Sequence, residues 1–314
     1  MPPRGRPRRP PREAPAGEVV RRYPLRYQFV KDETNDLYLR AIDKYVQWCY
    51  NLRLEPWKRG CLDTQVSSYI EHLYEDGLVL KQAALLLSGL QHFGCITAKS
   101  LMGSWRTFGA WKKQKAPGGA LPMPPGLVVA IAVYFSALNE QAMAASILMA
   151  FHCMLRTGEI LQLTCSRLSF QGNRAVFSIP DTKSSAAGEA VTVEDPVVIK
   201  VLRRAYDDLR SKQMNKFISL DDFQFRAVFK GAMLHLFGSD CGFTPYSFRK
   251  GGATYDYDTH GSLDRTMFRG RWKHLKTAKV YILSAKALSV EIHLEADVRE
   301  KIQAMNSLAS IMWN

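Results

Sequence analysis

Two arginines, a tryptophan and a tyrosine are the residues of this chain best suited to chemistry. Arg249, Trp272 and Tyr281 lie in one basic stretch near the C-terminus, and Arg156 lies well upstream. A guanidinium keeps its charge at physiological pH and meets phosphate oxygens through a planar fork of donors. A positioned phenol can serve as the nucleophile of a covalent mechanism. The set is therefore suited to cutting DNA through a protein–tyrosine bond.

Other residues could support this chemistry. Glu159 lies one helical turn after Arg156 and could hold its guanidinium in place. Lys183 falls at the tip of a predicted β-hairpin, where its ammonium could protonate the leaving 5′-oxygen. The indole N–H of Trp272 can donate to a phosphate oxygen, and His274 is an alternative donor.

The bulk properties of the chain favour a polyanionic partner. The chain has 314 residues, 46% of them apolar, and a formal net charge of +14. An excess of this sign favours double-stranded DNA, because each neutralised phosphate releases counterions. The most apolar stretch, residues 127–155, is interrupted at Asn139-Glu140-Gln141, so it predicts two buried helices and no membrane span.

The sequence predicts neither a metal nor another cofactor. Its six cysteines are scattered without a C-x-x-C pair, so a zinc site is not expected. It has no Walker A motif and no acidic cluster for two metals, so we expect no bound nucleotide. The Arg/Pro-rich N-terminus lacks the apolar core of a secretory signal. We therefore expect an intracellular protein, nuclear in a eukaryote and nucleoid-associated otherwise.

The residues divide into four predicted segments. Residues 1–24 form a basic Arg/Pro tail that is expected to be disordered, because its prolines forbid a helix. Residues 25–114 show helical periodicity, and residues 115–126 are rich in Gly and Pro, which indicates a linker. Residues 127–314 combine helices with a small β-hairpin or sheet and end in an amphipathic helix. The predicted class is mainly α, with an α+β second domain.

Basic residues outside the candidate site are predicted to contact DNA. The tail segment Pro3-Arg-Gly-Arg-Pro7 resembles an AT-hook core, whose arginines enter the minor groove. An unspecific basic arm and a targeting segment are the alternatives. The predicted DNA-binding residues are Arg4, Arg6, Lys112, Lys113 and Lys115.

The motifs together resemble those of the tyrosine recombinases, or phage-type integrases, over nearly everything after residue 25. Residues 154–164 resemble the family's first arginine box, residues 246–249 its His-x-x-Arg box and residues 270–272 its His/Trp position, with Tyr281 at the spacing of the nucleophile. Residues 248–254 look most like eukaryotic mobile-element versions, of the Crypton or DIRS kind. The helical segment 25–114 resembles the family's DNA-clamping core-binding domain.

The resemblance implies a catalytic site and a mechanism. The implied catalytic residues are Arg156, Lys183, Tyr246, Arg249, Trp272 and Tyr281, with Glu159 and His274 in support. It implies site-specific DNA recombination or integration through a 3′-phosphotyrosine intermediate, without metal or ATP. It also implies a homotetramer acting on two DNA sites, and the C-terminal helix could dock on a neighbouring copy or pack on its own domain.

One departure from the family pattern bears on activity. Tyr246 stands where the family carries histidine, and a phenol with a pKa near 10 is a poorer base that can still donate a hydrogen bond. Reduced but not abolished activity is the prediction. Tyr255 and Tyr257 offer further phenols, although Tyr281 is the predicted nucleophile.

Two other functions fit the same motifs. One is a strand relaxase of the type IB topoisomerase kind, which shares the chemistry but reseals its own strand. The other is a domesticated, non-catalytic DNA-binding protein derived from a mobile element. The identity of the products, or the formation of a covalent adduct, separates these alternatives from a recombinase.

Overall fold

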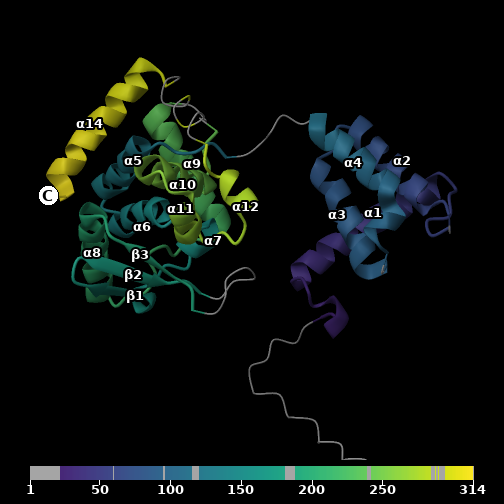
Figure 1. The fold of residues 1–314 in the computed structure, drawn as a ribbon, viewed down its shortest axis with the longest axis horizontal. Coiled ribbons are helices and arrows are strands. Elements are labelled where there is room, and N and C mark those ends of the chain that lie inside the picture. The colour runs from purple at the N-terminus through teal and green to yellow at the C-terminus, as the bar shows by residue number, and fades with distance from the viewer. Residues whose placement is uncertain are drawn as a thin grey trace, which may run out of the picture. The chain divides into compact units, whose positions relative to one another are not determined.

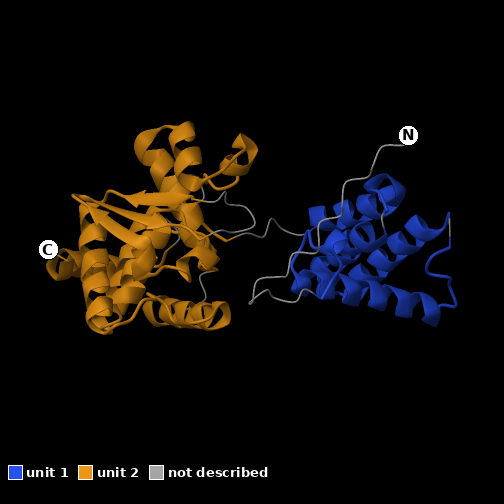
Figure 2. Ribbon diagram, turned by 90° about the horizontal axis from the view of Figure 1, so that it is seen from below, with its two compact units in different colours: residues 1–118 blue, residues 119–314 orange. Residues whose placement is uncertain are grey.

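The chain folds into two compact units. The computed structural model describes residues 22–58, 60–94, 96–114, 120–180, 188–238, 242–283, 287, 289 and 294–313. The units are Met1–Gly118 and Gly119–Asn314, and each has its own hydrophobic core (Figure 2). Both are mainly helical and the second carries a small antiparallel sheet, so the predicted fold class is confirmed.

The first unit is a helical bundle. Its elements are η1 (Leu25–Tyr27), α1 (Asp32–Asn51), α2 (Leu62–Glu75), α3 (Leu80–Gly94), η2 (Ala98–Leu101) and α4 (Met102–Gln114) (Figure 1). Helix α1 packs on α3 and α2 packs on α4, around buried side chains such as Tyr45, Ile70 and Leu86. The Asp63 carboxylate accepts the backbone N–H groups of Gly103 and Ser104, each at 2.8 Å, and so ties the start of α2 to the start of α4.

The second unit contains the candidate site. Its helices are α5 (Pro125–Ala137), α6 (Gln141–His152), α7 (Thr157–Ile160), η3 (Cys165–Arg167), α8 (Pro196–Ser211), α9 (Asp222–Phe237), α10 (Tyr246–His260), α11 (Leu263–Gly270), α12 (Leu275–Lys279) and α14 (Ala296–Trp313). Asp195 before Pro196 and Ser262 after Gly261 predict two helix starts, and both are confirmed. The Asp195 carboxylate accepts the Val197 N–H at 2.9 Å before α8, and the Ser262 hydroxyl accepts the Arg265 N–H at 3.3 Å before α11.

The sheet has one more strand than predicted. Strands β1 (Leu168–Gln171), β2 (Arg174–Ser178) and β3 (Ala190–Val193) pair antiparallel in that order. The alternation of residues predicted β2 and β3, but β1 is a short strand that the sequence analysis left unassigned. Leu168 pairs with Phe177, which pairs with Val191, and these three buried side chains share the face that joins the core.

The middle of the second unit is built from two nearly all-apolar helices. Helices α5 and α6 pack on each other, and α6 also packs on α8 and α10. Helix α14 lies along α5 of its own unit (Figure 1), where Val298, Ala309 and Trp313 are buried. The C-terminal helix was predicted either to dock on a neighbouring copy or to pack on its own domain, and in this structure it packs on its own unit. Among the described helices, none is long and apolar enough to cross a membrane.

Part of the predicted linker packs with the second unit. The side chain of Met123 is buried, and its backbone N–H donates to the Ser247 carbonyl at 3.2 Å. Helix α5 already begins at Pro125, because proline fits the first helical position, where no N–H donor is needed. Residues 120–126 therefore support α10, which carries Arg249, instead of only connecting the units.

A glycine pair lets α10 approach its neighbours at backbone distance. A Cβ on Gly251 would lie 2.1 Å from the Met123 carbonyl oxygen, and one on Gly252 would lie 2.1 Å from the Phe151 carbonyl oxygen. Real Cβ atoms do not come this close, so only glycine permits the packing. These contacts place Arg249 beside the end of α6.

We predict that Gly252→Ala lowers the free energy of unfolding by about 2–3 kcal/mol, because the added methyl group forces α10 away from α6. Gly231→Ala is the matched control, because Gly231 lies in α9 with nothing within 4 Å of the added atom. This control should raise stability by about 0.5–1 kcal/mol. Chemical denaturation of both variants measures the difference, and equal effects would contradict the close-approach argument.

Candidate functional site

Arg249 is the buried centre of the candidate site. Its side chain is 1% exposed, and its Nη1 and Nη2 groups donate to the carbonyls of Met154 and Gly270, the latter at 2.7 Å. Its Nε is buried without a hydrogen-bond partner among the described residues. The carbonyls fix the guanidinium but carry no full negative charge, and no carboxylate of the described residues pairs directly with Arg249.

The electrostatic surroundings of Arg249 favour an anion. Burial, and then the positive charges of Arg156 and Arg271, lower the pKa of Arg249 to about 10, while Glu159 opposes this effect. Arg249 therefore remains a cation at neutral pH, in surroundings that disfavour its charge. A phosphate beside it would relieve this cost.

Arg156 is held in place by Glu159. It lies in extended backbone directly before α7, and not within a helix as the sequence analysis assumed. The buried Glu159 carboxylate accepts the backbone N–H of Arg156 at 2.8 Å and its Nη1 at 2.6 Å. The predicted pairing of the two residues therefore occurs, through the geometry of a helix N-terminus. A third of the Arg156 side chain is exposed, so it can reach a ligand from solvent.

Tyr281 and Trp272 pack against each other beside Arg249. Tyr281 lies in the turn after α12, although the basic, small-residue sequence before it predicts a helix that includes it. Its ring centroid is 4.6 Å from that of Trp272, and the Arg249 guanidinium carbon lies 4.7 Å from the Trp272 ring and 5.5 Å from the Tyr281 ring. The Thr254 hydroxyl lies 3.1 Å from the Tyr281 carbonyl oxygen, which anchors the turn to α10. The guanidinium and the phenol thus belong to one cluster.

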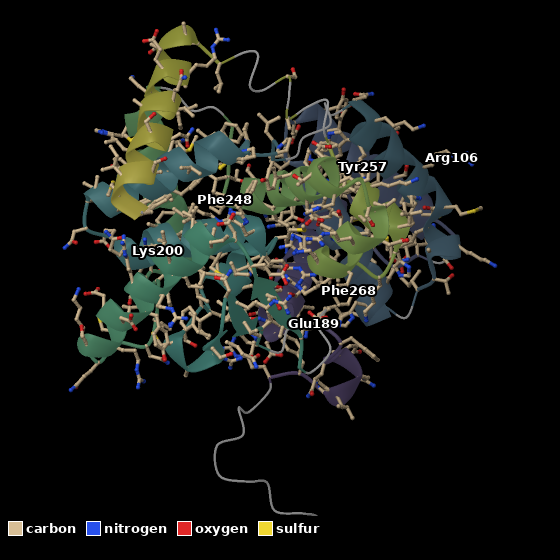
Figure 3. The ribbon with its side chains drawn as sticks, turned by 60° about the vertical axis from the view of Figure 1, so that its left-hand side comes forward. Arg106, Glu189, Lys200, Phe248, Tyr257 and Phe268 are labelled. Carbon is tan, nitrogen blue, oxygen red and sulfur yellow. The ribbon has the colours of Figure 1, made fainter. Side chains whose placement is uncertain are left out.

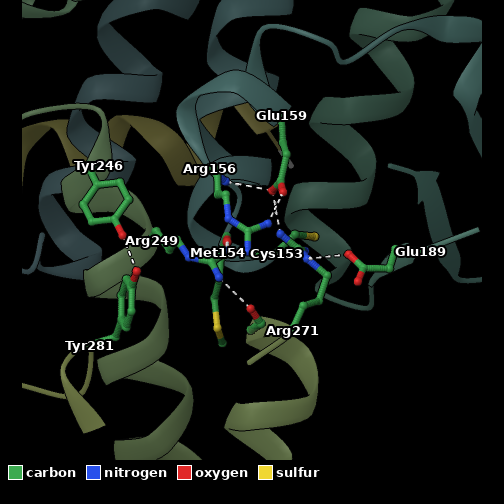
Figure 4. A network of polar contacts seen from close by, with 10 residues as sticks. Cys153, Met154, Arg156, Glu159, Glu189, Tyr246, Arg249, Arg271 and Tyr281 are labelled. Atoms are coloured by element: carbon green, nitrogen blue, oxygen red, sulfur yellow. Dashed lines mark hydrogen bonds and ion pairs between the residues drawn. The ribbon is translucent and has the colours of Figure 1, made fainter. Parts of the chain in front are cut away.

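Tyr246 contacts the candidate nucleophile directly. Its hydroxyl lies within hydrogen-bond distance of the Tyr281 hydroxyl (Figure 4). Burial, and then the hydrogen bond with Tyr281, raise the pKa of Tyr246 to about 12, although Arg249 and Arg156 lower it in part. Tyr246 is therefore neutral at physiological pH and is suited to donating a hydrogen bond to the Tyr281 oxygen.

Arg271 is a buried site residue that the sequence analysis missed. It ends α11 in the left-handed conformation, with φ 58°, and its side chain is 8% exposed. Its Nη2 donates to the Glu159 carboxylate at 2.5 Å, and its Nε lies 3.7 Å from the Glu189 carboxylate (Figure 4). Basic residues are frequent in this stretch, so nothing in the sequence separates Arg271 from the exposed ones.

Gly270 completes the turn that carries Arg271 and Trp272. A Cβ at Gly270 would lie 1.9 Å from the Trp272 ring. The indole therefore packs on the bare backbone of Gly270, whose carbonyl accepts from Arg249. In this Gly-Arg-Trp sequence, Gly270 leaves room for the indole, Arg271 pairs with Glu159, and Trp272 packs on Arg249.

Other predicted residues lie away from this cluster. His274 is exposed at the start of α12, and no contact among the described residues joins it to Arg249 or Tyr281. Tyr255 packs on Phe151 with its ring centroid at 5.7 Å, and Tyr257 lies further along α10 (Figure 3). Neither shares a described contact with Arg156 or Arg249.

The remaining predicted residues belong elsewhere in the chain. Lys112 and Lys113 are exposed at the end of α4, in the first unit. The predicted residues outside the described part of the chain are Arg4, Arg6, Lys115 and Lys183. Within the described part, no three His, Cys, Asp or Glu side chains gather as a metal site would require.

Comparisons with known proteins identify the fold. No family model matches the sequence, and no curated protein matches it. Among solved structures, the XerH site-specific recombinase bound to difH substrate, in a pre-cleavage complex, matches with a TM-score of 0.52 at 12% identity, over 82% of this chain and 78% of that one. The same recombinase bound to a palindromic difH substrate, in a post-cleavage complex, matches with a TM-score of 0.51 at 12% identity, over 80% and 75%. The chain therefore has the fold of these site-specific recombinases.

We predict that Glu159→Gln lowers the free energy of unfolding by about 3–5 kcal/mol, because it leaves two guanidiniums without their shared buried carboxylate. Glu194→Gln is the control, since Glu194 pairs with Arg174 on the surface at 3.2 Å. Its effect should stay below about 1 kcal/mol. Denaturant titrations of the two variants test this, and similar losses would show that the Glu159 pairing is no stronger than a surface pair.

Proposed function

We propose that this protein is a site-specific DNA recombinase or integrase that cuts and rejoins DNA through a 3′-phosphotyrosine bond at Tyr281. The observation that carries the proposal is the gathering of Arg156, Arg249 and Tyr281 in one cluster (Figure 4), with the Trp272 ring packed beside Arg249 and Tyr281. Arg156 and Arg249 come from distant parts of the sequence, yet both lie close enough to Tyr246 to lower its pKa in part. The likeness of the fold to site-specific recombinases supports the same conclusion.

The charge balance of the cluster supports a phosphate ligand. Arg156, Arg249 and Arg271 contribute three positive charges, and the contacting carboxylates are Glu159, which is buried, and the more exposed Glu189. The surplus positive charge lies in a largely desolvated place, where it interacts strongly with an anion. A scissile phosphate would supply the missing negative charge.

The proposed reaction has two transesterification steps. The Tyr281 oxygen attacks phosphorus and loses its proton to solvent, the bond from phosphorus to O5′ breaks, and we assign protonation of O5′ to Lys183. The 5′-hydroxyl of a partner strand then attacks the phosphotyrosine and gives its proton to Lys183, the bond from phosphorus to the Tyr281 oxygen breaks, and Tyr281 regains a proton from solvent as the DNA is resealed. The covalent bond conserves the phosphodiester energy, so the cycle consumes no ATP.

Each of the contacting residues has a proposed role. Arg156 and Arg249 neutralise the charge that builds on the non-bridging oxygens, and the indole N–H of Trp272 donates to one of them. Tyr246 donates a hydrogen bond to the Tyr281 oxygen, because its raised pKa keeps its hydroxyl protonated and so prevents it from acting as a base. Tyr246 thus replaces a histidine only in part.

The wider assignment follows from the same function. We propose that the first unit clamps DNA and that Lys112 and Lys113 contact the DNA phosphates. Arg4, Arg6 and Lys115 add further contacts to DNA in this proposal. We propose that four copies act on two double-stranded DNA sites, in the nucleus of a eukaryote or the nucleoid otherwise. An origin in a mobile element of the Crypton or DIRS kind belongs to the same proposal.

We predict that Tyr281→Phe abolishes the covalent adduct on a nicked suicide substrate while DNA binding stays nearly unchanged, because only the attacking oxygen is lost. Tyr255→Phe is the control and should form adduct at the wild-type rate. The measurement is the denaturation-resistant protein–DNA band, beside a filter-binding titration. A wild-type protein that binds DNA without forming this band would instead be the non-catalytic binding protein. Relaxed circles without exchanged arms would indicate the relaxase.

We predict that Tyr246→His raises or preserves the cleavage rate at pH 8 and introduces an inflection near the ordinary histidine pKa of about 6.5. The wild-type residue stays protonated until pH approaches 12, so it should contribute no inflection between pH 6 and 9. Tyr246→Phe, which lacks a donor, should be about 10-fold slower than wild type. Single-turnover cleavage across this pH range is the measurement. A slower Tyr246→His variant at pH 8 would contradict the assigned role.

A further inference from the structure

Arg271 connects the parts of the candidate site. Its guanidinium contacts the Glu159 carboxylate at 2.5 Å, the Cys153 carbonyl at 3.4 Å and the Glu189 carboxylate at 3.7 Å. Glu159 belongs to α7, Cys153 directly follows α6, and Glu189 directly precedes β3. The backbone of Arg271 joins Gly270 to Trp272, so one residue ties three other segments to the turn that precedes Tyr281.

The contact with Glu159 also reaches Arg156. One oxygen of this carboxylate accepts from Arg271, and the other accepts from Arg156 at 2.6 Å. Glu159 is 1% exposed, so water does not compete for these oxygens. The position of the Arg156 guanidinium therefore depends on a carboxylate that Arg271 holds from the opposite side.

Arg271 and Arg249 interlock through neighbouring backbone groups. Arg249 donates to the Met154 and Gly270 carbonyls, and Arg271 donates to the Cys153 carbonyl. Both arginines thus bind the short segment Cys153–Met154 after α6. Arg249 also binds the carbonyl of Gly270, the residue directly before Arg271. A shift of Arg271 would move both the segment that leads to Arg156 and the turn that carries Trp272.

We propose that Arg271 is a positioning residue that sets Arg156 opposite Arg249 and Tyr281 for the attack on phosphorus. The proposal rests on the proposed recombinase function. Arg271 does not itself bind the phosphate, because its guanidinium pairs with the carboxylates of Glu159 and Glu189, whereas the hydrogen bonds that the described residues give Arg249 go to carbonyls. It acts through the Glu159 carboxylate, and its effect is on the geometry of Arg156.

The first test compares Arg271→Met with Arg269→Met. Arg269 is a matched control from the same helix, because it also binds a buried carboxylate, that of Asp256, and a backbone carbonyl, that of His152 at 2.8 Å. Neither partner contacts Arg156. We expect Arg271→Met to slow adduct formation by about 100-fold, the effect of a small misplacement of a reacting group, with DNA affinity nearly unchanged. Arg269→Met should cleave at close to the wild-type rate once it is folded.

The second test separates positioning from general damage. A methylphosphonate at the scissile position removes the charge of one non-bridging oxygen, so a site with a misplaced arginine should lose less on this substrate than wild type does. If Arg271 acts through Arg156, Arg271→Met and Arg156→Met should show the same reduced preference for phosphate over methylphosphonate. Arg269→Met should keep the wild-type preference. Reduced stability alone would not change this ratio.

A conservative variant keeps the test decisive if Arg271→Met does not fold. Arg271→Lys retains the charge and can reach Glu159, but it cannot also span to the Cys153 carbonyl, so it should shift the rate and the preference in the same direction by a smaller factor. An unchanged preference in the folded Arg271 variants would overturn the positioning role alone. Failure of the wild type to form any adduct would overturn the proposed function, and this inference with it.

Discussion

The candidate site depends on keeping a guanidinium charged inside the protein. Arg249 is buried, and backbone carbonyls from two distant segments hold it in place of a carboxylate. Carbonyl dipoles orient the group while leaving its charge uncompensated, and the nearby Arg156 and Arg271 add to the cost. A protein tolerates such an arrangement where an anion completes it, which is why the burial of Arg249 points to function as well as to folding.

The surrounding fold supplies the close contacts that this burial requires. Gly251 and Gly252 let α10 touch the backbone beside α5 and α6, so Arg249 can reach the Met154 carbonyl. Gly270 lets the Trp272 ring lie on the backbone, where the ring covers the guanidinium from one side. Glycine is therefore concentrated where helices meet the site, and each of these contacts would be lost if the backbones moved apart by the width of a methyl group.

The sequence predicted those parts of the site that are set by local pattern. The pairing of Glu159 with Arg156 and the N-caps at Asp195 and Ser262 follow from short-range spacing, and all three occur. Strand β1 was missed because a short strand beside a turn has too few residues to show alternation. Arg271 was missed for a different reason, since its burial depends on Glu159, which is remote in the sequence. Long-range partners of this kind are not visible in a single sequence.

In the proposed reaction, Tyr246 limits what the site can do with a proton. A histidine at this place could accept the proton of the attacking phenol, whereas the pKa of Tyr246 is raised to about 12 and its hydroxyl can only donate near neutral pH. Because the two hydroxyls are in contact, a hydrogen bond donated by Tyr246 stabilises the negative charge that develops on the Tyr281 oxygen as its proton leaves to solvent. The guanidinium carbon of Arg249 lies 5.5 Å from the centre of the Tyr281 ring, so its positive charge also attracts that negative charge. A site arranged in this way would favour the phenolate as leaving group in rejoining at least as much as it favours the phenol as nucleophile in cleavage.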